Sequence, residues 1–194
     1  MNQQAARQPG QTACVRAEIS ADIAARDALL DRAMGPKWRK KASHRLRRGR
    51  IPAEGLALVA EDAAGRLVGT VRLWSVTAGE GGAAALLLGP LAVDASVKSA
   101  GIGSALMRRA VEEARRLGHG AILLVGDAAY YRRFGFTADR TGRLAMPGPY
   151  ERERFLALEL VQGALDGASG TLVATGRRKK PAPVRQDEGR ARAA

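Results

Sequence analysis

One segment of the 194-residue chain constrains its fold more than any other, the stretch from residue 83 to residue 125. An apolar run over Ala83 to Val93 leads through a short loop into a helical pattern over Gly101 to Leu117, and Ala121 to Val125 follows as a second continuous apolar run. Two apolar runs joined by a helix indicate parallel strands in a βαβ crossover, because a tight turn cannot connect parallel neighbours. Ala121 to Val125, apolar at every position, is also typical of a strand buried on both faces.

The residues before the crossover predict an antiparallel meander. Three successive strands joined by turns are expected at Leu56 to Glu61, Leu67 to Val76 and Ala83 to Val93. Gly89 and Pro90 interrupt the third strand, and proline removes a ladder donor, so we expect a bulge that splays the neighbouring strands. The sequence therefore predicts an α/β (α+β) fold: a mixed, mostly antiparallel central sheet flanked by helices, with a βαβ core.

The remaining elements are weaker predictions. They are a strand at Ala13 to Glu18, a helix capped by Ser20 and running to Met34, a basic helix at Lys37 to Gly49, a short helix around Tyr130 to Phe134, a strand near Phe136 and a strand at Phe155 to Val161. Residues 1–11 and 175–194 lack periodicity and are rich in Gln, Gly, Pro, Arg and Ala, which is typical of disordered ends. We therefore expect one folded domain over residues 12–174.

The composition is that of a globular protein. At 46% apolar residues, 194 residues suffice for one domain with a substantial core. No apolar run reaches the length of a membrane span, and the polar stretch 1–11 lacks the apolar core of a signal peptide. The single cysteine, Cys14, excludes an internal disulfide framework and a site built from several thiolates. We expect a soluble, cytoplasmic protein without a metal site.

The net charge of +13 is concentrated in two segments. Residues 37–50 carry eight Lys and Arg without an acid, and residues 177–192 carry seven against Asp187 and Glu188, so the rest of the chain is electrically balanced. A surface that is basic throughout, as in a nucleic-acid-binding domain, is not indicated. Apart from Trp38 the two segments also lack interleaved aromatic residues, so any nucleic-acid binding would be nonspecific and sensitive to salt.

The loop that enters the crossover helix carries the first functional signal. The segment from Val93 to Ser104 runs from strand to helix and places Gly101 and Gly103 in the first helical turn, with Lys98 nearby. Free amide groups and the positive end of the helix dipole favour a phosphate at such a position, and glycine allows a ligand to approach the backbone. The Rossmann and P-loop patterns are excluded, because they need a third glycine at Leu106 or a GKS or GKT sequence.

Two motifs in order give this segment a family resemblance. The sequences KSAGIG at 98–103 and YRRFGF at 131–136, with Leu91-Ala92-Val93 before them, resemble the GNAT superfamily of N-acetyltransferases. The resemblance covers about residues 14–162, and the amino-acid sequences of several expected strands are similar to those of the YhbS-like branch. It implies a fold with splayed central strands and an acyl-CoA-binding βαβ core.

The resemblance implies acetyl-CoA as the acyl donor and assigns its binding residues. These are Leu91, Ala92, Val93, Lys98, Ser99, Ala100, Gly101, Ile102, Gly103 and Ser104. The chain departs from the family where Lys98 replaces Gln or Arg, and where Ser99 and Ala100 replace Arg, Lys or Gly. Because backbone amides form most of such a cradle, we expect binding to persist.

The resemblance also implies the chemistry. An amine attacks the thioester directly in a ternary complex, a backbone N–H near Leu91 or Ala92 stabilises the oxyanion by ~3 kcal/mol, and Tyr131 protonates the departing thiolate. Tyr130 is the alternative acid, and packing is the alternative role for both tyrosines. Asp127 is expected to cap the short helix. Several general bases remain open, together with a water relay: Glu61, Asp94, His44, His119 and Glu159.

The acceptor and the assembly remain open at this point. The resemblance implies that the basic helix at Lys37 to Gly49 borders the acceptor. Its charge there favours an anionic small molecule, an acidic N-terminal peptide or a phosphorylated partner over a polyamine, but a solvated basic face explains the same residues equally well. A catalytically silent acyl-CoA-binding module is the principal alternative to an enzyme, and a nucleic-acid-associated protein is a weaker one. Either a monomer or a homodimer is compatible with the sequence.

Overall fold

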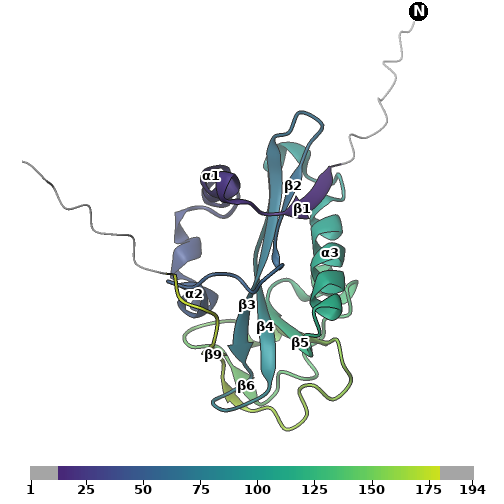
Figure 1. Cartoon of the computed structure of the whole chain (residues 1–194). Coiled ribbons are helices and arrows are strands. Elements are labelled where there is room, and N and C mark those ends of the chain that lie inside the picture. Colours follow the sequence, from purple (N-terminus) through teal and green to yellow (C-terminus); the bar gives the residue numbers. More distant parts are fainter. Residues whose placement is uncertain (1–12, 180–194) are drawn as a thin grey trace, which may run out of the picture.

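The computed structural model describes residues 13–179 and consists of a central sheet with helices on both faces (Figure 1). The sheet has seven strands in the order β1-β2-β3-β4-β5-β7, with β9 pairing with β3. Their bounds are β1 Cys14–Ala17, β2 Ala57–Glu61, β3 Leu67–Thr77, β4 Ala84–Val93, β5 Ala121–Val125, β7 Phe155–Glu159 and β9 Val173–Ala174. Within this seven-stranded sheet only β4 and β5 pair in parallel, so the predicted mixed, mostly antiparallel sheet is confirmed.

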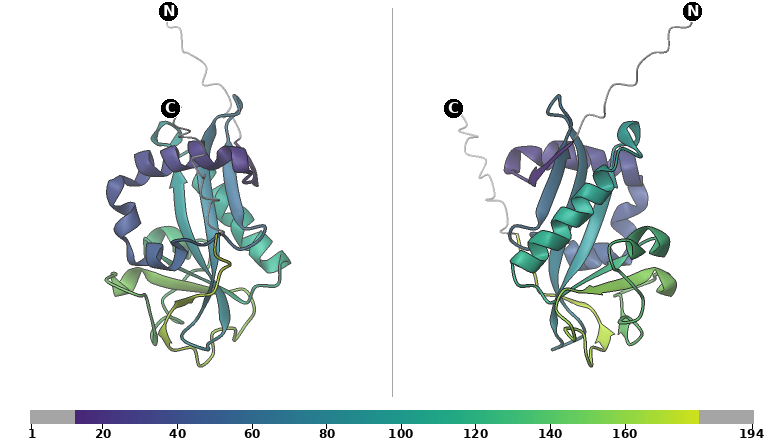
Figure 2. Two further views of the ribbon diagram at one scale, coloured as in Figure 1. Left: turned by 60° about the vertical axis from the view of Figure 1, so that its left-hand side comes forward. Right: turned by 90° about the vertical axis from the view of Figure 1, so that its right-hand side faces the viewer.

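The helices divide between the two faces of the sheet (Figure 2). They are α1 Ile23–Met34, α2 Ala42–Arg47, α3 Ile102–Arg116 and α4 Ala128–Arg132. Leu106, Met107 and Ala110 of α3 are buried against one face. On the other face, Leu30 of α1 packs near Ala92 of β4, and Ala42 and Leu46 of α2 pack near Trp74 and Leu87. Strand β4 is therefore covered on both faces.

The crossover from β4 through α3 to β5 is the predicted one, with β5 coinciding with the expected residues 121–125. Gly69 on β3 allows α3 to pack closely, since a Cβ at this position would lie 2.8 Å from Cδ1 of Leu106. The apolar stripe of the helix and a glycine on the strand below it thus fix the distance between α3 and the sheet.

Strand β4 bulges where the sequence predicts it. The pairing with β3 changes register between Val71, which faces Leu91, and Leu73, which faces Leu88, so Gly89 and Pro90 together stand opposite the single residue Arg72, and β4 carries one extra residue. Strands β4 and β5 are paired only at Leu86 with Ile122 and at Leu87 with Leu123. They separate beyond that point, and the predicted splay between central strands is confirmed.

The region around α1 and α2 differs from the sequence prediction. Ser20 does not cap α1; it lies in a 3₁₀ turn, Ser20–Asp22, and the backbone N–H of Ile19 donates to Asp22 Oδ2 at 2.8 Å. The expected basic helix at 37–49 is a 3₁₀ turn, Pro36–Lys40, followed by the six-residue α2. Repulsion among its closely spaced cations, without an acid in the segment, disfavours a longer helix.

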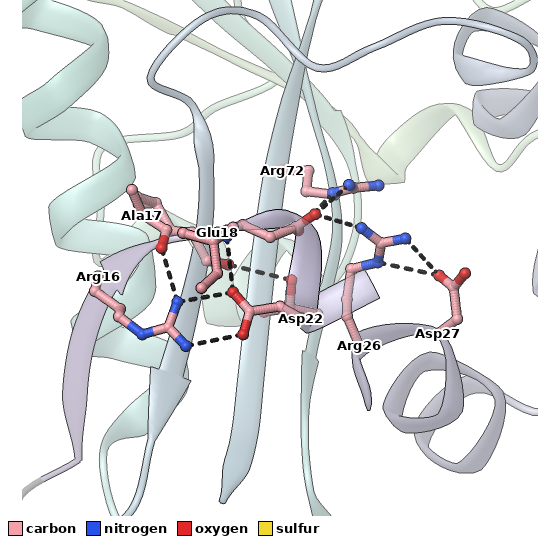
Figure 3. Close-up of polar contacts among 10 residues, drawn as sticks. Arg16, Ala17, Glu18, Asp22, Arg26, Asp27 and Arg72 are labelled. Atoms are coloured by element: carbon pink, nitrogen blue, oxygen red, sulfur yellow. Dashed lines mark hydrogen bonds and ion pairs between the residues drawn. The ribbon is translucent and has the colours of Figure 1, made fainter. Parts of the chain in front are cut away.

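A buried ion-pair network ties α1 to the sheet (Figure 3). Glu18, which follows β1, accepts hydrogen bonds from Nε and Nη2 of Arg72 on β3, at 2.9 and 2.6 Å, and also pairs with Arg26 of α1. Arg26 in turn contacts Asp27 at 2.8 Å. Only 6% of the Glu18 side chain is exposed, so a single carboxylate compensates two largely buried guanidinium groups.

The chain beyond β7 departs from the expected boundary. The strand expected near Phe136 is reduced to one bridge between Thr137 and Ala157, and a second sheet pairs β6 Leu144–Ala145 with β8 Gly170–Thr171. The backbone N–H of Lys179 donates to the carbonyl of Gly49 at 2.9 Å, so the domain continues past residue 174. This pairing uses backbone groups only, and the side-chain pattern gives no sign of it. Of the two segments expected to be disordered, 1–11 and 175–194, residues 1–11 and 180–194 lie outside the described residues.

Candidate active site

The loop before α3 presents unbonded backbone amides, as the two-glycine pattern predicts. The first hydrogen bond of the helix runs from Ala105 N–H to the Gly101 carbonyl at 3.0 Å, which leaves the N–H groups of residues 102–104 without an intrahelical acceptor. Gly101 caps the helix with a φ of 78°, a left-handed conformation that glycine adopts without a steric penalty. These amides lie at the positive end of the 15-residue helix α3.

A hollow of about 400 Å³ lies directly in front of these amides. The predicted residues that line it are Val93, Lys98, Ser99, Gly101, Ile102, Gly103 and Ser104, joined by Val97, Tyr130 and Arg133. Ala100, Leu91 and Ala92 do not line this hollow. The structure thus brings the strand end, the loop, the helix start and α4 together around a single space with two cations on its rim.

Arg133 is a member of this site that the sequence analysis missed. Its guanidinium carbon lies 4.2 Å from the ring centre of Tyr130, which fixes it beside the hollow by a cation–π contact. The available signal was its spacing, because residues three apart on a helical turn share a face and Tyr130 already stood in the short helix. Arg133 and Lys98 together supply the positive charge at this end of the site.

Ser99 shows backbone strain in the same loop. Its φ is 68°, and it is the one non-glycine with positive φ among residues 13–179. Such a conformation costs of order 1 kcal/mol and is concentrated in ligand-binding segments. A glycine, one of the residue types that the family uses beside this position, would adopt it without that cost.

The pairing of β4 with β3 shows which N–H groups of β4 beyond the bulge point away from β3. Asp94 N–H donates to the carbonyl of Val68 on the β3 side at 2.8 Å. In an antiparallel ladder, successive residues direct their N–H groups to opposite sides, so Ala92 points toward β3, whereas Leu91 and Val93 point away from it. The N–H groups of Leu91 and Val93 therefore face the gap between β4 and β5, and Ala92, which was also predicted, contributes packing against Trp38 and Leu30.

Tyr131 is held beside the end of β5. Its ring packs against Gly126 and meets Phe136 edge to face at 6.0 Å between ring centres. Burial raises the pKa of Tyr131 to about 12, with the neighbouring Tyr130 adding to the effect. Its hydroxyl makes no hydrogen bond within residues 13–179 and is not fully enclosed. Tyr130, the alternative candidate, lies instead at the cradle, and Asp127 caps α4 by accepting from the Tyr130 N–H at 2.9 Å, as predicted.

The carboxylates considered as general bases are all engaged. Glu61 forms an ion pair with Arg16, and Glu159 forms one with Arg140 at 3.1 Å. Asp94 accepts from the backbone and hydroxyl of Ser96 and pairs with Arg32 at 3.1 Å, which lowers the pKa of Asp94 to about 2. Burial lowers the pKa of both His44 and His119, and three arginines lower that of His44 further.

A second hollow, of about 170 Å³, lies on the opposite side of β5 from α3. The start of α2, the end of β5 and the loop before β7 form its wall, through Lys41, Ala42, Ser43, Val125, Pro149, Tyr150, Glu151 and Arg154. Arg154 also reaches the carbonyl of Gly126 at 3.4 Å, the glycine against which Tyr131 packs. The two hollows therefore flank the diverging ends of β4 and β5 from opposite faces of the sheet.

Comparisons with known proteins agree with this arrangement. Residues 53–138 match the model of the acetyltransferase (GNAT) domain. The chain is 30% identical over 156 residues to the uncharacterized N-acetyltransferase YhbS of Escherichia coli K12, covering 80% of this chain and 92% of that protein.

Solved structures give the same result. The crystal structure of E. coli YhbS in complex with CoA matches with a TM-score of 0.73 at 30% identity, over 88% of this chain and 93% of that one. A GNAT family acetyltransferase of Brucella melitensis in complex with acetyl-CoA matches with a TM-score of 0.54 at 26% identity, over 77% of this chain and 89% of that one. Within residues 13–179, no helix is long and apolar enough to cross a bilayer.

Proposed function

Because this chain belongs to the GNAT family of acetyltransferases, we propose that the hollow at the start of α3 binds acetyl-CoA, that the hollow at the end of β5 binds an amine, and that the acetyl group passes between them through the gap of β4 and β5. The protein is an acyl-CoA-dependent N-acetyltransferase. The observation that supports the site assignment best is the row of unbonded amides at the start of α3, which opens on the hollow of about 400 Å³. Acetyl-CoA is abundant in the cytoplasm, which we propose as the site of action.

The start of α3 binds the pyrophosphate of the donor. The N–H groups of Ile102, Gly103 and Ser104 donate to phosphate oxygens, and the helix dipole adds to the attraction. Lys98 and Arg133 on the rim neutralise the remaining negative charge. Gly103 leaves room for the hydroxyl of Tyr130 at the cradle, since a Cβ there would lie 2.8 Å from it.

The splayed edge of β4 holds the pantetheine arm and the thioester. With β5 absent as a partner beyond Leu87, the N–H groups of Leu91 and Val93 are available to the ligand. The N–H of Leu91, next to the bulge, donates to the thioester oxygen and stabilises the oxyanion of the tetrahedral intermediate, a contribution of ~3 kcal/mol in comparable sites.

Tyr131 completes the reaction. The nitrogen lone pair of the amine forms the C–N bond, the C–S bond breaks with its electron pair on sulfur, and the Tyr131 hydroxyl gives that sulfur a proton. A pKa of about 12 keeps this hydroxyl protonated at neutral pH. The new ammonium loses its proton to water, and the Tyr131 phenolate takes a proton back from water, so the enzyme is restored. Water serves as the base because the carboxylates considered for this role are committed to arginines and backbone N–H groups.

Release of free thiol from acetyl-CoA in the presence of an amine library tests this function. We expect turnover by the wild type, and a fall in kcat of about 100-fold or more in Tyr131→Phe with unchanged affinity for CoA. Equal turnover in the two proteins would remove Tyr131 from the mechanism. Binding of acetyl-CoA without thiol release for any amine would instead establish the catalytically silent module.

A further inference from the structure

Arg47 is a buried cation without a carboxylate partner. It is the last residue of α2, and 6% of its surface is exposed. Arg26, the other arginine among the buried residues, pairs with Glu18 and Asp27, and Arg72 on the same face shares Glu18 (Figure 3). No Asp or Glu in the described range 13–179 lies within salt-bridge distance of Arg47.

The guanidinium of Arg47 is held by its own helix and by the ring of Trp38, whose centre lies 6.0 Å from the guanidinium carbon, and one nitrogen is left over. Nε donates to the carbonyl of Ser43 at 3.1 Å, and Nη2 donates to the hydroxyl of Ser43 at 3.3 Å. Nη1 has no acceptor among the described residues and is not fully enclosed. It lies 3.7 Å from the position that a Cβ would take on Gly89, so it faces the bulge of β4.

This arrangement is unfavourable for the isolated protein. Burial, followed by the charge of Arg72, lowers the pKa of Arg47 to about 10, yet the side chain stays protonated at neutral pH. A buried cation without a counter-ion destabilises a fold, and a bound anion removes that penalty. An exposed arginine would interact with the carbonyls at the end of α2 equally well, so capping the helix does not explain the burial.

The position of Arg47 relates it to the acceptor hollow. Ser43, which orients the guanidinium, also lines the hollow of about 170 Å³ at the end of β5. Gly89 precedes Leu91 by two residues, a distance of ~7 Å along a strand. Nη1 therefore lies beside the bulge that precedes Leu91, the residue at which the amine attacks in the proposed reaction.

We propose that Arg47 binds the carboxylate of the acetyl acceptor, and that the acceptor is therefore a small amine bearing a carboxylate, such as an amino acid, rather than a polyamine. This assignment rests on the proposed function, because it concerns the amine of that reaction. Arg47 sets specificity and takes no part in bond making, and the free carboxylate replaces the counter-ion that the protein itself does not provide.

Turnover with paired acceptors tests the assignment. The probes are the amino acids and their carboxamides, with acetyl-CoA as donor. For the wild type we expect kcat/KM to favour the carboxylate by at least about 10-fold over its carboxamide. Arg47→Met should abolish this preference while the affinity for acetyl-CoA changes less than about 2-fold. Arg48→Met, an exposed neighbour with the same loss of charge, should retain the preference. A wild type that prefers carboxamides or spermidine overturns the assignment.

Thermal unfolding provides a readout independent of turnover. Without ligand, Arg47→Met should melt about 2 °C or more above the wild type, because it removes an uncompensated buried charge. Acetate or glycine, compared with chloride at equal ionic strength, should stabilise the wild type and Arg48→Met but not Arg47→Met. A lower melting temperature for Arg47→Met, or an equal response of all three proteins to these anions, shows a packing role and overturns the proposal. An anion response confined to proteins with Arg47, together with no acetylation of any amine, would support the anion site and refute the proposed function.

Discussion

The ring of Tyr131 packs against Gly126 so closely that a Cβ on the glycine would lie 2.2 Å from Cε2 and 2.8 Å from Cδ2 of the ring. Gly126 follows β5 directly, and its N–H donates to the carbonyl of Arg154 at 2.9 Å. The backbone of Gly126, on one side of the Tyr131 ring, is therefore fixed. The ring cannot keep its position if Gly126 gains a side chain.

We predict that Gly126→Ala impairs catalysis by displacing Tyr131. Displacing a reacting group by ~1 Å can cost about 100-fold in rate, and overpacking costs about 1–3 kcal/mol of stability. Steady-state kinetics and urea unfolding would measure both. Gly142→Ala is the matched control, because nothing lies within 4 Å of its Cβ position, and it should leave both quantities unchanged. Wild-type kcat in Gly126→Ala would argue against a requirement for this placement.

We predict that Tyr131 ionises near pH 12. Burial disfavours the phenolate, so the folded state loses stability as pH rises above the ordinary tyrosine pKa of ~10. The difference in phenolate absorbance between the wild type and Tyr131→Phe, followed over pH, would give the midpoint of the Tyr131 titration. The wild type should also lose stability relative to this variant between about pH 10 and pH 12. Any fall in kcat below pH 10 then has another cause. A midpoint at or below the ordinary value would contradict the buried placement.

We predict that Arg133 contributes to donor affinity. Its guanidinium lies over Tyr130 at the rim of the cradle, where a pyrophosphate gains a charge-assisted contact. Arg133→Gln should raise the Kd for acetyl-CoA about 10-fold and weaken its dependence on salt, measured by calorimetry. Arg132→Gln, the exposed neighbour outside the cradle, should change the Kd less than about 2-fold. Equal effects of the two substitutions would indicate only a change in overall charge.

The sequence predicted the elements whose signals are local. The alternating and continuous apolar runs located β2 to β5, the interruption at Gly89 and Pro90 located the bulge, and the amphipathic pattern located α3. The same local chemistry identified most residues of the cradle, because a helix start with two glycines exposes amides whatever surrounds it.

The failures share a different physical origin. The pairing of residues 177–179 with 49–51 uses backbone groups alone, so the side chains there carry no periodic signal. The roles of Arg47 and Arg133 depend on distant partners, Gly89 and the start of α3. A sum of charges over residues 37–50 could suggest an anionic acceptor but could not show which arginine is buried, since burial depends on the tertiary packing of α2 against the sheet.

The network around Glu18 supports the last prediction, which concerns stability rather than catalysis. Glu18→Gln would leave Arg26 and Arg72 largely buried without the carboxylate that they share, and breaking a buried pair in this way costs about 3–5 kcal/mol. Urea unfolding should therefore show a large loss of stability. Glu112→Gln removes a carboxylate from the exposed face of α3 and should change stability by less than about 0.5 kcal/mol. A loss as small as that control would mean that solvent already screens the two guanidinium groups, and that the first residues of α1 are not anchored to β3 by charge.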